Sequence, residues 1–174
     1  MEDIQSPATT RPSVACLARR GANIRNVASP YWRGWIKPGF RCLVPATSFC
    51  EYTDGQPKVP HWFALGADRP LFAFAGIWRP WTGGRGTKAE RKALADETGS
   101  ENREHLLFGF LTTDANDVVR PIHGKAMPVI LTGEECDAWL EADVEAALKL
   151  QRPLPADRLA VVATGEREDA AAVA

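Results

Sequence analysis

Apolar and polar residues alternate along much of the chain, and turn-forming residues separate the alternating segments. Period-two alternation bounded by Gly, Pro, Asn or Asp is typical of β-strands. It predicts strands at 42–44, 48–52, 59–65, 71–78, 105–112, 129–131 and 159–164. We expect Pro45 to break the first two strands apart and Asp54-Gly55 to form a hairpin turn. Because short turns join neighbouring strands, the pairing should be antiparallel.

Helical signals are fewer and shorter. Ser29 and Pro30 predict a helix start, with Trp32 and Trp35 on one face. Further helices are expected at 113–119, after a capping box at 132–135, and at 143–150. The polar stretch 79–104 is expected to be a long surface excursion with one helical turn around 89–94.

These elements predict an α+β domain: a bent or barrel-like antiparallel β-sheet with a few peripheral helices. We place it at 23–164. Residues 1–22 are polar and irregular and predict a poorly ordered arm, while the acidic, Ala-rich stretch 165–174 predicts a flexible tail.

Composition narrows the class of protein. The 174 residues are 45% hydrophobic and 25% charged, as expected for one globular domain. A formal net charge of −1 provides no overall attraction to nucleic acid, so such binding would need a local basic patch. The four Cys form no C-x-x-C pair and no zinc spacing with the three His, which favours reduced thiols, a cytoplasmic protein and no metal. We expect no secretory signal and no membrane span.

Glu51 is the first candidate for chemistry. In a strand it shares a face with Phe49, so its carboxylate lies either at a solvated strand end or in a pocket. Burying a carboxylate without a partner costs several kcal/mol, so a pocketed Glu would need a functional reason.

His123 and the Asn23-Ile-Arg25 segment are the other candidates. His123 lies in a loop bounded by Pro121 and Pro128. It is either a structural side chain or a proton-transfer group, because imidazole ordinarily titrates near neutral pH.

Four motifs follow one another along the chain: Arg41-Cys-Leu-Val-Pro45 with Phe49-x-Glu51, Phe-Ala-Phe-Ala-Gly76-Ile-Trp78, Leu111-Thr-Thr-x-Ala-Asn116, and Ile122-His123-x-x-x-Met127-Pro128. With these motifs in this order, the sequence resembles the SRAP family (SOS-response-associated peptidases, or abasic-site processing proteins) over about 23–164. Asn23-x-Arg25 is similar to the family's Asn-x-Arg active-site element.

The resemblance implies a cofactor-free, monomeric protein that binds single-stranded DNA at abasic sites and associates with the nucleoid. In the family, a Cys exposed after removal of Met adds its amine and thiol to the sugar aldehyde and closes a thiazolidine. The implied roles are proton transfer by Glu51 and His123, orientation of the terminal residue by Asn23, and phosphate binding by Arg25. Trp32 and Trp35 would either stack on unpaired bases, at about 1–3 kcal/mol per base, or pack in the core.

The sequence departs from this pattern at position 2, where it has Glu2, and in the segment before Asn23, so we expect an SRAP-like domain that is truncated or divergent at its N-terminus. The internal Cys have their nitrogens in peptide bonds, so we expect impaired crosslinking, and it stays open whether the chain is an enzyme. One alternative is a pseudoenzyme that binds single-stranded DNA without a covalent step. Another is a hydrolase using Cys50 with His123, which alternation disfavours because Cys50 and Glu51 should lie on opposite strand faces.

Overall fold

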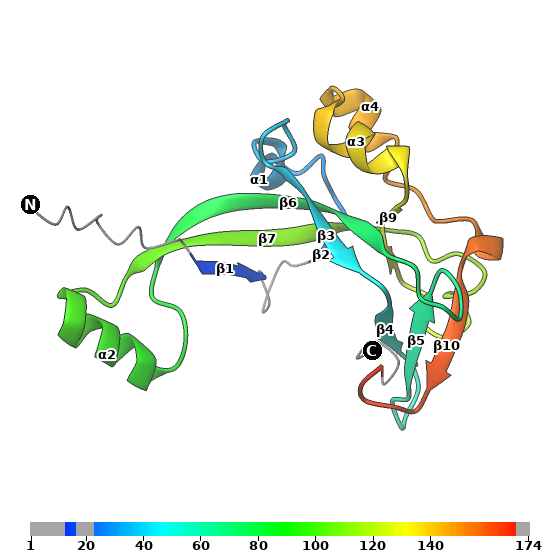
Figure 1. Ribbon diagram of the computed structural model, residues 1–174, viewed down its shortest axis with the longest axis horizontal. Helices are drawn as coiled ribbons and strands as arrows, with labels where there is room; N and C mark the ends of the chain where they lie inside the picture. Colours follow the sequence, from blue (N-terminus) through cyan, green and yellow to red (C-terminus); the bar gives the residue numbers. More distant parts are fainter. Residues whose placement is uncertain (1–12, 17–22, 170–174) are drawn as a thin grey trace, which may run out of the picture.

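Two long strands form the centre of the fold. β6 (Phe72–Gly83) and β7 (Arg103–Thr113) pair antiparallel from Gly76 opposite Phe110 to Gly83 opposite Arg103. They make one curved ribbon that runs across the molecule (Figure 1). The computed structural model describes residues 13–16 and 23–169.

Shorter strands extend this ribbon into a curled, mixed sheet. β3 (Arg41–Ala46) pairs antiparallel with β6, and β9 (Ile130–Leu131) pairs with the beginning of β6. β1 (Ser13–Cys16), β2 (Asn23–Ile24) and β8 (Met127–Pro128) all pair with β7. A second sheet has the order β10 (Ala160–Thr164), β5 (Pro60–Ala64), β4 (Phe49–Tyr52).

The predicted α+β class with a bent sheet is confirmed, but the prediction of purely antiparallel pairing is wrong. β1 and β2 run parallel to β7. Both precede the first strand that alternation had predicted, and a pattern of short turns indicates only antiparallel neighbours.

Proline at position 45 does not break its strand. β3 continues through Pro45, which lies opposite Ala73 of β6. In the described sheet β3 pairs only with β6, so it is an edge strand, where a residue without an N–H is tolerated. The chain passes into the second sheet only after β3 ends, at Thr47 and Ser48.

The excursion predicted at 79–104 is shorter than expected because β6 and β7 extend into it at both ends. Between them lies α2 (Lys88–Thr98), which starts with a complete capping box between Thr87 and Glu90. This reciprocal cap, not an apolar face, marks the helix, since α2 contains no buried residue.

The other helices cover one side of the ribbon (Figure 1). They are α1 (Pro30–Arg33), α3 (Glu134–Glu141) and α4 (Val144–Leu148), and a 3₁₀ turn, η1 (Ala156–Arg158), follows. Asp143 caps α4 as predicted, accepting a hydrogen bond from the Ala146 N–H at 2.8 Å. At α3 the N-cap is Gly133, one residue after the predicted cap, although Glu135 still accepts from the Thr132 N–H.

The helix predicted at 113–119 is wrong. The buried Asn116 side chain accepts from the Val118 and Val119 N–H groups and donates to the Leu154 carbonyl. An Asn side chain that binds the backbone two and three residues ahead favours a turn over a helix. The segment therefore forms a series of turns before β8.

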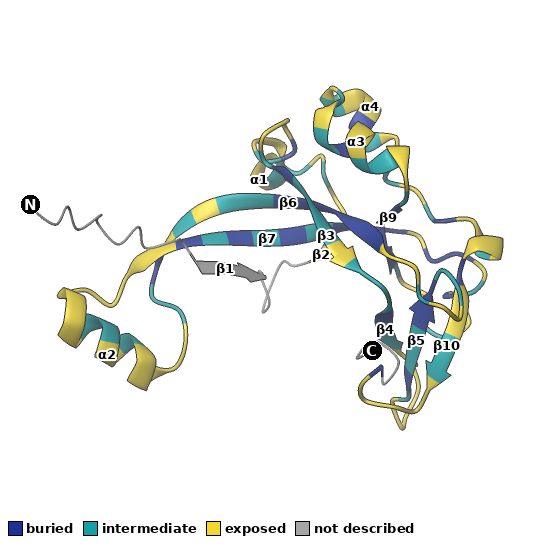
Figure 2. Cartoon of the chain, in the orientation of Figure 1, coloured by how far each residue is buried: buried dark blue, intermediate teal, exposed yellow. Residues whose placement is uncertain are grey.

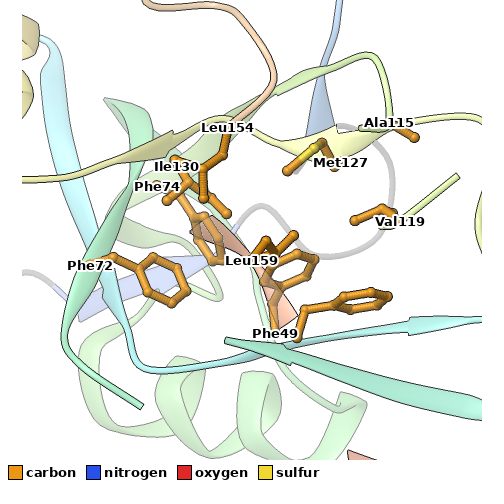
Figure 3. Packing of buried hydrophobic residues seen from close by; sticks show 10 residues of the cluster. Phe49, Phe72, Phe74, Ala115, Val119, Met127, Ile130, Leu154 and Leu159 are labelled. Atoms are coloured by element: carbon orange, nitrogen blue, oxygen red, sulfur yellow. The ribbon is translucent and has the colours of Figure 1, made fainter. Parts of the chain in front are cut away.

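Strand alternation divides the core between the two faces of the ribbon, as the buried and half-buried positions along β7 show (Figure 2). Phe74 belongs to a cluster with Phe49, Met127 and Ile130 (Figure 3). The cluster also contains Phe63, and the partly buried Phe110 packs against it. Ile77 and Leu111 face the opposite cluster, which contains Trp139 of α3.

Most of the predicted arm, 1–12 and 17–22, lies outside the described residues, and the part between them forms β1. Of the predicted tail, the described part is bound to the body. Asp169 is buried and forms two 2.8 Å contacts with the Arg69 guanidinium, and the Glu166 carbonyl accepts from the Trp62 indole. Residues 170–174 lie outside the described range.

Candidate functional site

The predicted residues Asn23, Glu51 and His123 line one cavity of about 390 Å³. They come from β2, from β4 and from the loop between β7 and β8, three segments far apart in the chain. The rest of the lining is mostly apolar: Phe49, Cys50, Phe74, Phe110, Thr112, Ala126, Met127 and Pro128. The cavity thus lies between the two sheets, on the ribbon face that carries Phe74 and Phe110.

Strand pairing positions two of these side chains. Glu51 pairs with His61 of β5 and is two residues after the buried Phe49 in β4. Its carboxylate therefore lies on the same strand face as Phe49, toward the cavity. Asn23 pairs with Phe110 and is exposed, at the end of a two-residue strand.

Backbone turns position His123. Its N–H donates to the Val119 carbonyl at 2.8 Å, and the Ile122 N–H donates to the same oxygen at 2.9 Å. Val119 is itself held by the Asn116 side chain and is fully buried. The imidazole therefore projects from a loop anchored in the core.

The ionisable side chains form a short row. His123 Nε2 lies 3.9 Å from Glu51 Oε2, and His123 Nδ1 lies 3.6 Å from Asp54 Oδ1. The side chains of Glu51 and His123 are about equally accessible, at 26% and 25%, and that of Asp54 is 51% exposed. Burial raises the pKa of Glu51, an effect that His123 opposes and Asp54 strengthens. A half-buried carboxyl group whose pKa is raised, beside an imidazole, can exchange protons in both directions.

Cys50 also lines the cavity, so alternation along β4 does not separate it from Glu51 as fully as predicted. Its Sγ lies 3.9 Å from the Glu51 carbonyl oxygen. Burial, with a smaller contribution from Glu51, raises the pKa of this thiol, although a hydrogen bond from the His61 backbone opposes the shift. A thiol kept protonated is a poor nucleophile, which disfavours the hydrolase interpretation.

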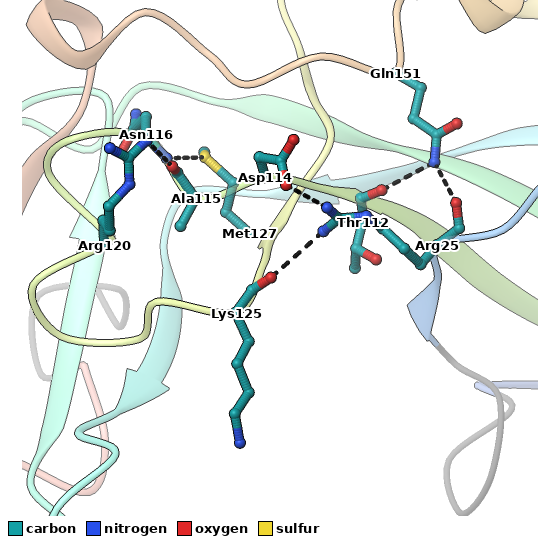
Figure 4. A network of polar contacts seen from close by, with 9 residues as sticks. All are labelled: Arg25, Thr112, Asp114, Ala115, Asn116, Arg120, Lys125, Met127 and Gln151. Atoms are coloured by element: carbon teal, nitrogen blue, oxygen red, sulfur yellow. Dashed lines mark hydrogen bonds and ion pairs between the residues drawn. The ribbon is translucent and has the colours of Figure 1, made fainter.

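Arg25 lies at the edge of the site, where it is already paired (Figure 4). Its guanidinium forms an ion pair with Asp114 and donates to the Lys125 carbonyl at 3.4 Å. Gln151 joins the Arg25 carbonyl to the Thr112 carbonyl through its amide nitrogen, at 2.9 Å each. These contacts tie β2 to the end of β7 and to the loop that carries His123.

Trp32 and Trp35 are not brought to the cavity. Both pack against the cluster that contains Ile77 and Leu111, on the opposite face of the ribbon. Arg79 also lies over the Trp35 ring, at 5.8 Å from its centroid. This placement supports the core-packing alternative, and base stacking by these two residues stays a prediction.

Two residues of the site were not predicted to belong to it. The sequence analysis assigned Asp54 only to a turn and Thr112 only to a strand. The sequence contained a usable signal for Asp54, an acid three residues after the candidate Glu51, but nothing connected that turn to the His123 loop.

Among residues 23–169, no group of three or more His, Cys, Asp or Glu side chains is arranged to hold a metal ion. In the same part of the chain, no helix is long and apolar enough to cross a membrane.

Comparisons with known proteins identify relatives of the chain. It is 31% identical over 133 residues to the abasic site processing protein YoqW of Bacillus subtilis, an alignment that covers 70% of this chain and 51% of YoqW. It is 30% identical over 113 residues to the abasic site processing protein YoaM of the same organism, covering 60% of this chain and 42% of YoaM. The chain thus spans about half the length of these relatives.

Solved structures show the same fold. A crystal structure of a Bacteroides thetaiotaomicron protein matches with a TM-score of 0.62 and 28% identity, covering 79% of this chain and 56% of that one. A Bordetella bronchiseptica protein matches with a TM-score of 0.59 and 26% identity, covering 82% of this chain and 63% of that one. The family model described as SOS response associated peptidase (SRAP) matches residues 12–167. This chain therefore belongs to the SRAP family.

Proposed function

We propose that the cavity formed by Asn23, Glu51 and His123 binds single-stranded DNA at an abasic site and promotes proton transfer at the exposed sugar. The observation that carries this proposal is the approach of Glu51 to His123, 3.9 Å apart in one cavity of an SRAP-family chain. The names of the relatives YoqW and YoaM describe abasic site processing, which supports the same substrate.

The sugar at an abasic site needs an acid and a base. Its closed ring opens to an aldehyde when the anomeric hydroxyl loses a proton and the ring oxygen gains one. Ionised Glu51 is suited to accept the first proton, and protonated His123 to supply the second. An amine then adds to the aldehyde, and the adduct loses water to form an imine. Both steps need further proton transfers, which the same pair can carry out.

Asn23 and Arg25 would position the strand. The exposed Asn23 amide can both donate and accept hydrogen bonds at the cavity, so it suits an attacking amine. Arg25 would exchange its partner Asp114 for a backbone phosphate, since both present oxygen acceptors to the guanidinium.

A polypeptide with the present sequence has Glu2 where a thiazolidine would need a thiol and a free amine on one residue. We therefore infer that such a polypeptide binds abasic DNA without a stable covalent link. The α-amine of Met1 can still form an imine, which hydrolyses readily unless it is reduced.

The test uses three single-stranded oligonucleotides that differ at one position: an abasic sugar, its tetrahydrofuran analogue, which has no aldehyde, and an intact nucleotide. In native gels we expect the abasic and analogue strands to bind more tightly than the intact strand. In denaturing gels we expect no heat-stable band, except after borohydride reduction of the abasic complex alone. Glu51→Gln and His123→Ala should slow this trapping by about 100-fold or more, while the matched α3 variant Glu134→Gln leaves it unchanged.

Equal binding of abasic and intact strands would refute the proposed substrate. A heat-stable band without borohydride would instead refute the inference that this polypeptide forms no stable covalent link.

A further inference from the structure

His123 lies between two carboxylates, one facing each ring nitrogen. Glu51 Oε2 is 3.9 Å from Nε2, and Asp54 Oδ1 is 3.6 Å from Nδ1. Both separations exceed a hydrogen bond and fall within the range of a charge interaction. Small side-chain rotations would close either of them, as is common when a site tightens around its substrate.

Asp54 is also attached to both neighbours of His123. Its backbone N–H donates to the Ile122 carbonyl at 3.3 Å, and its Oδ2 accepts from the Gly124 N–H at 3.4 Å. The turn after β4 is therefore hydrogen-bonded to the loop on both sides of His123. Such attachment fixes the distance between Asp54 and His123 Nδ1 even though Asp54 is half-exposed.

A neutral imidazole has one N–H and one lone pair, so the two carboxylates compete for a single donor. Asp54 lies nearer its ring nitrogen, at 3.6 Å against 3.9 Å for Glu51, and hydrogen bonds to the backbone on both sides of His123 hold it there. The single N–H is therefore expected on Nδ1, toward Asp54. The Nε2 lone pair then faces Glu51 and can exchange a proton with it.

The neighbouring ionisable groups do not disturb this arrangement. His61 pairs with Glu51 across the sheet, but its Nδ1 lies 3.1 Å from the Val59 carbonyl. Arg25 is held by Asp114 and by the Lys125 carbonyl. Cys50 carries a thiol whose pKa is raised, so it adds no charge beside Glu51.

We propose that Asp54 is a positioning residue that holds the N–H of neutral His123 on Nδ1, leaving the Nε2 lone pair to face Glu51 and the cavity. The same device, a carboxylate that fixes the tautomer and orientation of a working imidazole, recurs in many enzymes. Its functional meaning here depends on the function proposed above, but the tautomer is a property of the free protein.

The test is ¹⁵N NMR of histidine-labelled protein without DNA, at a pH where the imidazoles are neutral. The three His spin systems are assigned with His61→Gln and His123→Gln variants. We expect His123 to have its proton on Nδ1 in the natural sequence. Asp54→Ala should transfer it to Nε2, the tautomer that imidazole prefers in water, and Asp68→Ala, an exposed turn acid, should change nothing.

Asp54→Asn keeps an oxygen acceptor and the backbone attachment, so it should retain the Nδ1–H tautomer and serves if the Ala variant does not fold. A proton on Nε2 in the natural sequence overturns the proposal without any variant. An unchanged tautomer in folded Asp54→Ala does so as well.

A second readout separates this proposal from the proposed function. Asp54→Ala should slow borohydride trapping on abasic DNA by about 10-fold, with little change in the affinity for the strand. If the natural sequence shows no preference for abasic DNA, the proposed function fails while the NMR result still decides the role of Asp54. If trapping occurs and Asp54→Ala leaves its rate unchanged, the proposed function stands and the role of Asp54 does not.

Discussion

The two faces of the β6–β7 ribbon use polar groups in opposite ways. On the face under α3, Trp139 is fully buried and its indole N–H lies 3.1 Å from both the Cys42 and the Gly76 carbonyls. The buried Arg41 donates to the Ala142 carbonyl and lies over the Trp139 ring. The Trp139 indole and one Arg41 nitrogen thus bind backbone carbonyls and join α3 and the turn after it to the sheet.

On the other face, polar groups point into a cavity and remain partly exposed. Glu51 and His123 keep about a quarter of their side-chain surface accessible, and each faces a group that can change its charge. The same alternation that hides Leu111 on one side thus presents Phe110 and Thr112 to the cavity on the other. The comparison shows one closed, packed face and one face with partly exposed ionisable groups, and it is on the second that we propose the chemistry.

The largest effect is expected on the closed face. Trp139→Ala should reduce the free energy of unfolding by about 3–5 kcal/mol, because it opens a cavity in a fully buried cluster and leaves two carbonyls without their indole donor. Urea denaturation measures this loss. In the folded fraction the preference for abasic DNA should persist.

Trp35→Ala provides the matched control, since Trp35 packs on the same face but is only partly buried. The Trp35→Ala variant should lose clearly less free energy of unfolding than Trp139→Ala. If both substitutions destabilise equally, or if folded Trp139→Ala loses its preference for abasic DNA, the division between the faces is wrong.

The sequence predicted the strands of the central ribbon at 71–78 and 105–112. It did not predict how their two faces divide the core, because that depends on which distant elements pack on each face. It also predicted the candidate site in part: Glu51 and His123 were identified, and the structure places them in one cavity. Their roles stay predictions. Asp54 was missed because its relation to His123 depends on how the turn after β4 meets a distant loop.

Failures of prediction arose where a long-range contact outweighed a local signal. The 113–119 segment has helical capping residues, yet the Asn116 side chain donates to the Leu154 carbonyl and accepts from the Val119 N–H, which favours a turn. Pro45 lies in a strand because the edge of β3 needs no donor there. Parallel pairing of β1 and β2 with β7 leaves no short-range signature at all.

The open face should show a trade of stability for chemistry that depends on pH. Burial raises the pKa of Glu51 in the folded state, so between its unfolded pKa, about 4.3, and its folded pKa the unfolded chain binds fewer protons and stability falls as pH rises. The full cost is present above the folded pKa. Glu51→Gln should therefore be more stable than the natural sequence at pH 7, and the difference should vanish below about pH 4.

Chemical denaturation across this pH range measures the difference, and the exposed α3 variant Glu134→Gln should show little of it. A Glu51→Gln protein that is less stable at pH 7 would mean that His123 stabilises the carboxylate by more than burial costs. Glu51 would then be a structural ion pair, and the contrast between the faces would weaken.

The smallest effect is expected at the rim of the cavity. Arg25→Ala should weaken binding of single-stranded DNA and lower the slope of log affinity against log salt by about 0.7, the value for one phosphate contact. Asp114→Asn should strengthen the binding and raise the slope, because it frees the guanidinium for phosphate. The Arg25–Asp114 pair is largely exposed, at 48% and 79%, so the gain should be only about two- to fivefold.

Arg33→Ala is the matched control, since Arg33 is exposed on α1, over the face opposite the cavity. Its affinity and salt slope should equal those of the natural sequence. If Arg33→Ala lowers the slope and Arg25→Ala does not, DNA runs over the α1 side near Trp32 and Trp35. The two faces would then have to exchange the roles assigned to them here.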